Sequence, residues 1–198
     1  MDSIHRTKEE VFEAAKAVAR EECIPEMKVD DFVDEKPIKV YPVNDGDVFD
    51  LGGREIEVVE VPGHTVGSIV LIDHKTRICF NGDACNSNTL LQFPYSTTVE
   101  EYMESLLYFK KFQPDFDIIY AGHDIIQPSA IDEGIELVGR VLAGSDDKSV
   151  LNDPRRGSVT YAAKHREGTM LRADGKYFNM CYNPERILFE GEDAQVIK

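Results

Sequence analysis

Hydrophobic residues recur at helical spacing in three segments of the chain. Two of these segments begin with a threonine that is followed three residues later by a glutamate, Thr7 with Glu10 and Thr98 with Glu101. In this capping box each side chain accepts a hydrogen bond from the backbone N–H of the other residue, so the pattern indicates a helix start. The predicted amphipathic helices cover residues 7–22, 98–113 and 129–143, and Gly144 ends the third.

Hydrophobic and polar residues alternate in several segments between the helices. Ile56 and Val58 alternate with Glu55 and Glu57, which indicates a strand with one buried face and one face in water. The alternation predicts two hairpins, one pairing 47–51 with 55–61 and one pairing 68–73 with 77–81. Further strands are predicted at 38–41, 117–121, 177–182 and 186–190, and the polar segment 145–156 is predicted to be a linker.

Three of the predicted strands are followed by a residue that can bind a metal ion. His64, Asp83 and His123 each come directly after a glycine at the end of a strand. Each also has a structural interpretation, because a Pro-Gly turn can carry a histidine by chance and an aspartate can hydrogen-bond within a turn. Two imidazoles and one carboxylate at equivalent strand ends nevertheless form a donor set suited to zinc, iron or manganese. The spacing therefore makes these three residues a candidate metal site.

The composition restricts the class of protein and the partners it can have. A chain of 198 residues with 42% hydrophobic residues suits a single soluble domain over residues 1–198. The net charge of -15 argues against a nucleic acid or an anionic membrane as partner, since both require a basic surface. The same charge disfavours anionic substrates unless a bound cation reverses the local field.

The four cysteines form no Cys-x-x-Cys pair, which favours buried, reduced thiols in a cytoplasmic protein. Cys85 lies two residues after Asp83, and a buried thiol is the preferred interpretation over a metal ligand. The N-terminal segment has no apolar core of a signal peptide, and no apolar run approaches the roughly 18 residues of a membrane span.

The segments PGHTVGS at 62–68, NGD at 81–83 and AGH at 121–123 together resemble the metallo-β-lactamase-fold hydrolases. The resemblance covers about residues 43–144, and the strand-rich tail 157–190 is similar to the closing strands of bacterial members. It implies an α/β (α+β) fold, the αββα sandwich, with a one- or two-metal site at the sheet edge. By motif, His64 would bind the first ion, His123 the second, and Asp83 would bridge them. The chemistry implied is hydrolysis by a metal-activated water.

One large departure from the family pattern changes the functional expectation. The family's His-x-His-x-Asp-His motif should lie upstream of His64, but the only upstream histidine is His5. The resemblance therefore implies a shortened domain, the C-terminal part of the fold, with an incomplete metal site that holds at most one ion per chain. Zinc is the expected metal, with iron or manganese as alternatives.

Three functions stay open at this point. The chain is a hydrolase relative whose ordinary hydrolysis is weak or lost, or a metal-dependent hydrolase that takes its missing ligands from another chain, or a one-metal enzyme using a two-histidine, one-carboxylate site. The missing strands would also leave an apolar sheet face uncovered, so the chain is expected to form a homodimer. Asn86, Asn88 and Tyr95 would border the site, whereas His74 and His165 are predicted to be solvated.

Overall fold

The computed structural model describes residues 3–4, 6–18, 24–36, 38–153 and 157–189. The chain divides into two compact units, residues 1–43 and residues 44–198. Among the described residues, no helix is both long and apolar enough to cross a membrane.

In the first unit, β1 (Ser3–Ile4) pairs antiparallel with β2 (Ile38–Lys39). Helix α1 (Lys8–Val18) begins at the predicted capping box, because the Thr7 amide donates to Glu10 Oε2 at 2.8 Å and the Glu10 amide donates to Thr7 Oγ1 at 3.3 Å. Two short 3₁₀ turns, η1 (Ile24–Glu26) and η2 (Val29–Asp31), precede β2. The predicted helical residues 19–22, together with Cys23, lie outside the described residues.

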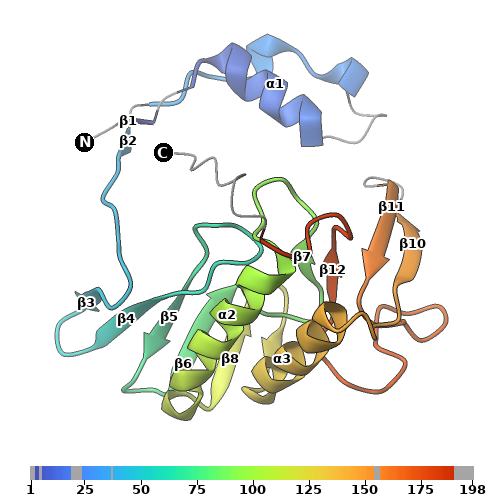
Figure 1. Ribbon diagram of the computed structural model, residues 1–198. Helices are drawn as coiled ribbons and strands as arrows, with labels where there is room; N and C mark the ends of the chain where they lie inside the picture. The colour runs from blue at the N-terminus through green and yellow to red at the C-terminus, as the bar shows by residue number, and fades with distance from the viewer. Residues whose placement is uncertain (1–2, 5, 19–23, 37, 154–156, 190–198) are drawn as a thin grey trace. The chain divides into compact units, whose positions relative to one another are not determined.

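The second unit is built on a six-stranded sheet (Figure 1). Its strand order is β3 (Val48–Asp50), β4 (Glu55–Glu60), β5 (Ile69–Asp73), β6 (Ile78–Gly82), β8 (Ile118–Ala121) and β9 (Ile125–Ile126). All neighbours are antiparallel except β6 and β8, which are parallel. Both predicted hairpins are confirmed. The pairing also makes β4, β6 and β8 run in one direction, so the residues that follow them emerge at one edge of the sheet.

A second sheet contains four strands in the order β10 (Ser149–Asp153), β11 (Gly157–Tyr161), β12 (Met180–Tyr182) and β7 (Thr89–Leu91). The prediction of a linker over 145–156 is wrong for residues 149–153, which pair with β11 along its whole length. The predicted strand at 186–190 is also wrong, because residues 186–189 form no strand. The short strands β7 and β9 carry no alternation long enough to predict.

Two helices cover one face of the six-stranded sheet, α2 (Val99–Phe109) and α3 (Ser129–Leu142) (Figure 1). A 3₁₀ segment, η3 (Lys110–Asp115), continues α2 through Pro114, where the sequence predicted the helix to end. The Thr98 hydroxyl accepts the Glu101 amide at 3.2 Å, which confirms the second capping box. Gly144 adopts φ +66, the left-handed conformation expected after α3. The core residues that the sheet contributes include Val59, Val70, Ile72, Cys79 and Ile119.

The opposite face of the same sheet carries exposed aromatic residues. Phe80 of β6 is paired in register with Tyr120 of β8, and their rings stack at a centroid separation of 5.7 Å. Ile125 of β9 continues the row and is 62% exposed. Adjacent exposed apolar side chains of this size favour association. The homodimer stays a prediction, and these residues are where we expect it to form.

Replacing both aromatic residues with lysine, as Phe80→Lys/Tyr120→Lys, is expected to convert a dimer into a monomer, because each protomer would have to bury two charges without partners. Sedimentation velocity at several protein concentrations measures the change. Leu107→Lys, on the exposed side of α2, is the matched control and should leave the association unchanged. A wild-type chain that sediments as a monomer at all concentrations would contradict the prediction.

Candidate metal centre

His64 lies in the turn that joins β4 to β5, and a hydrogen bond fixes its imidazole. The ring Nδ1 is 2.9 Å from the backbone carbonyl oxygen of Leu90. Because a carbonyl only accepts, Nδ1 carries the proton, and Nε2 of the neutral ring keeps its lone pair. Metal-binding histidines are oriented in this way by a partner on the other ring nitrogen. The rings of Phe93 and Tyr95 contact the imidazole edge-to-face at 5.9 and 6.5 Å.

Gly63 brings this turn against α2. A Cβ placed on Gly63 would lie 2.4 Å from Cδ2 of Tyr102, whose ring is fully buried. The Tyr102 hydroxyl donates to the carbonyl oxygen of Ala84 at 2.7 Å, one residue after Asp83. Tyr102 therefore connects the turn of His64 to the segment of Asp83, and only a glycine leaves room for its ring. The φ of Gly63 lies outside the left-handed range, so glycine is required here for space and not for backbone freedom.

Asp83 follows β6 and is half-buried. Its Oδ1 accepts a hydrogen bond from Asn86 Nδ2 at 3.0 Å. The amide of Gly122, after β8, donates to the carbonyl oxygen of Gly82 at 2.7 Å, which joins the two strand ends. A Cβ on Gly122 would lie 2.7 Å from Asp83 Oδ1, so glycine is needed there for the carboxylate to keep its position.

His123 follows β8 and is largely exposed. Its Nε2 lies 3.5 Å from Asp83 Oδ1. The next residue, Asp124, accepts a hydrogen bond from the Ser87 hydroxyl at 2.7 Å. Hydrogen bonds from Ser87 and then Tyr177 lower the pKa of Asp124, which keeps this carboxylate ionised. A negative charge beside Asp83 and His123 favours a cation at this edge.

The three predicted residues line one pocket of about 320 Å³. Asn86 and Asn88 line it as the sequence suggested, whereas Tyr95 is not among the lining residues and contacts only the ring of His64. Sequence reasoning missed Asp124 and Ser87, although Asp124 stands next to His123 and offered a signal. Met170 was missed as well, because it belongs to a loop far from β8 in the sequence, and no pattern around it indicates a binding site.

The donor types of His64, Asp83 and His123 fit a divalent metal, but sharing a pocket does not bring the three side chains together at one point. Within the ranges that the structure describes, no group of three or more His, Cys, Asp or Glu side chains is close enough to hold an ion. Among the contacts of the described residues, the one that joins two of the three candidate ligands is between Asp83 and His123. Cys85 is fully buried, as the sequence suggested, and burial raises the pKa of its thiol to about 12. Cys79 and Cys181 are buried as well.

Part of the chain matches a known family and several of its members. The family model described as the metallo-beta-lactamase superfamily matches residues 5–123. The acyl-coenzyme A thioesterase MBLAC2 of Gallus gallus is 34% identical over 88 residues, which are 44% of this chain and 28% of that protein. The hydroxyacylglutathione hydrolase GloC of Haemophilus influenzae is 32% identical over 84 residues, 40% of this chain and 38% of that protein.

Among solved structures, the archaeal metallo-beta-lactamase superfamily protein ST1585 from Sulfolobus tokodaii aligns with 74% of this chain and 55% of its own. The sequence identity is 20% and the TM-score 0.45. The matches to the thioesterase and to the hydroxyacylglutathione hydrolase each span well under half of the length of those two proteins.

Proposed function

Because the chain belongs to the metallo-beta-lactamase superfamily, we propose that it provides one part of a metal-dependent hydrolytic site and hydrolyses weakly or not at all by itself. His64, Asp83 and His123 are the proposed ligands. One observation carries the proposal: all three line a single pocket, and yet they do not form a cluster of three around one point among the described residues.

Ligand number explains why such a site is weak. A catalytic zinc ion usually has three protein ligands, so a site that holds two ions needs about six protein ligands in total. A divalent ion in a hydrolase supplies Lewis-acid activation of water or of the scissile carbonyl. Within the chain, His64 is oriented by Leu90 and Asp83 by Asn86, so two of the three side chains are held in place before any ion arrives. The His123 side chain is exposed, and among the described residues its contact with Asp83 is the one that could orient it.

The relatives suggest the substrate class to test first. Both names denote hydrolysis of an acyl group carried on a thiol, as in acyl-coenzyme A and hydroxyacylglutathione. A thioester is therefore the proposed substrate class of the completed site.

We expect at most one zinc ion per chain to remain after dialysis. Calorimetric titration and elemental analysis of the purified chain measure affinity and stoichiometry, and release of free thiol from an acyl-coenzyme A measures hydrolysis. Manganese and iron(II) are titrated in parallel, because a two-histidine, one-carboxylate set also accepts them. Two tightly held ions per chain, or rapid thioester hydrolysis by a monomer, would contradict an incomplete site.

The exposure of His123 favours one alternative, a site completed by ligands of another chain. An exposed ligand at the edge of a pocket can be reached from outside, whereas a buried one cannot. In that case the rate per chain would rise with protein concentration, or on addition of the second polypeptide, as the shared site assembles.

A further inference from the structure

A second pocket, of about 440 Å³, lies beside the candidate metal centre and has no role in the proposed function so far. It is formed by β10 and by the loop that follows β11. Met170 lines both pockets, so they are neighbours. The other residues that line the second pocket are Ser149, Leu151, Lys164, His165, Arg166, Glu167, Gly168 and Thr169.

The hydrogen bonds of Asn179 determine the tautomer of His165. Asn179 is fully buried, and its Oδ1 accepts the amides of Ala163 and Met180 at 3.2 and 2.9 Å. This fixes the amide orientation, so Nδ2 is the atom 3.2 Å from His165 Nε2, and it can only donate. His165 Nε2 is therefore an acceptor and the ring proton sits on Nδ1. Burial also lowers the pKa of His165, consistent with a neutral ring.

His165 was predicted to be solvated, and that prediction is wrong for its ring nitrogens. Its Nδ1 is buried and has no hydrogen-bond partner among the described residues. A buried donor without a partner costs about 1–3 kcal/mol, so the fold keeps this N–H at a penalty. A ligand oxygen admitted from the adjoining pocket by a small shift of the exposed loop 166–170 would remove that penalty.

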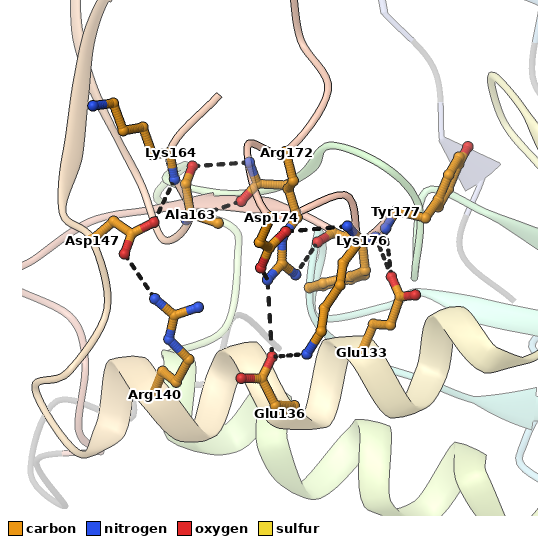
Figure 2. A network of polar contacts seen from close by, with 12 residues as sticks. Glu133, Glu136, Arg140, Asp147, Ala163, Lys164, Arg172, Asp174, Lys176 and Tyr177 are labelled. Carbon is orange, nitrogen blue, oxygen red and sulfur yellow. Dashed lines mark hydrogen bonds and ion pairs between the residues drawn. The ribbon is translucent and has the colours of Figure 1, made fainter. Parts of the chain in front are cut away.

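Lys164 and Arg166 flank His165 in the sequence. The lining of the second pocket therefore contains these two cations and one carboxylate, that of Glu167. The two cations stand out on a chain whose net charge is -15. No ion pair joins either cation to an acidic side chain in the part of the chain that the structure describes. Figure 2 shows the Lys164 side chain extending away from the polar network, which holds only its backbone.

That polar network fixes the base of the loop (Figure 2). Asp147 accepts the Lys164 amide and the Arg140 guanidinium, both at 2.8 Å, and so connects the loop to α3. The Ala173 amide donates to the Lys164 carbonyl oxygen at 2.8 Å. Arg172 is buried, pairs with Asp174, and donates to the Phe178 carbonyl oxygen at 2.7 Å. Lys164 is therefore presented from the braced base of the loop, and Arg166 follows it two residues further along.

We propose that the second pocket binds a phosphate-type oxyanion carried by the substrate whose cleavable end lies in the neighbouring pocket, an extension that rests on the proposed function. Two cations and one N–H donor match a group with several acceptor oxygens and about two negative charges, better than a carboxylate with two oxygens. Met170, shared by the two pockets, marks the path between the ends of such an elongated substrate.

Inorganic pyrophosphate is the probe, and succinate the matched carboxylate. Both are titrated into the metal-free chain, with binding followed by calorimetry and by the imidazole ¹H–¹⁵N signals of His165. We expect saturable pyrophosphate binding with a shift of the Nδ1 signals, weakened at least about tenfold in Lys164→Ala/Arg166→Ala. The control, Lys75→Ala/Lys111→Ala, removes the same charge away from the pocket and should change the affinity less than about twofold.

Equal weakening in both double variants, or no saturable binding, would overturn the proposal. Tighter binding of succinate than of pyrophosphate would overturn the phosphate assignment. The anion titration needs no metal, so its result is independent of the zinc titration. Anion binding without zinc binding would support the second pocket and contradict the proposed function. Zinc binding without anion binding would support the proposed function and contradict the second pocket.

Discussion

Asp83→Ala is expected to weaken zinc binding by at least about tenfold and to remove any thioester hydrolysis, the largest functional effect of a single substitution in this chain. Asp83 is the one anionic member of the three candidate ligands, and its Oδ1 lies 3.5 Å from Nε2 of His123. Its removal leaves two imidazoles that do not touch and no anionic donor between them. Calorimetric zinc titration and the free-thiol assay measure the two effects. Asp83→Asn, which keeps the shape without the charge, should lose nearly as much.

A second substitution tests whether the Asp83 carboxylate must be held in its present position or need only be present in the chain. Gly122→Ala leaves Asp83 in the sequence but places a Cβ 2.7 Å from its Oδ1, so the carboxylate must move. We expect a loss of zinc affinity close to that of Asp83→Ala. The control is Asp117→Ala, which removes an exposed carboxylate paired with Arg77 at the other end of β8. An unchanged zinc affinity in Asp83→Ala would exclude this residue as a ligand.

Gly63→Ala is expected to destabilise the fold by about 3 kcal/mol, the largest effect on stability that we predict. The added methyl group would lie 2.4 Å from the buried ring of Tyr102, and that ring is held by its hydroxyl bond to Ala84. Neither the turn nor α2 can retreat without opening the core. Urea unfolding followed by circular dichroism measures the change as a shift in midpoint at constant slope.

Gly67→Ala is the matched control for Gly63→Ala. Gly67 lies in the same turn and does not adopt a left-handed φ, and a methyl group added there would meet no atom within 4 Å. Its substitution should therefore change the free energy of unfolding little. If Gly63→Ala proved as stable as Gly67→Ala, the close approach of Tyr102 would not be a constraint on the fold.

The sequence by itself determined the elements whose signals are local. The capping boxes at Thr7 and Thr98 placed two helix starts, because the residues that form each cap lie within one turn. Alternation placed both hairpins for the same reason, since a hairpin pairs near neighbours. The positions of His64, Asp83 and His123 after three strands also followed from sequence, and the structure places all three at one pocket.

Only the tertiary structure decided the features that depend on distant partners. Residues 149–153 were predicted to belong to a polar linker but form β10, because pairing with β11 satisfies their backbone groups whatever their side chains. β7 is too short to predict and is fixed by β12, which comes much later in the chain. His165 was expected to be solvated in a basic segment, and the buried amide of Asn179 holds its ring partly buried instead. The spacing between ligands at the metal centre is likewise set by packing, such as Gly122 against Asp83, which no local pattern of residues encodes.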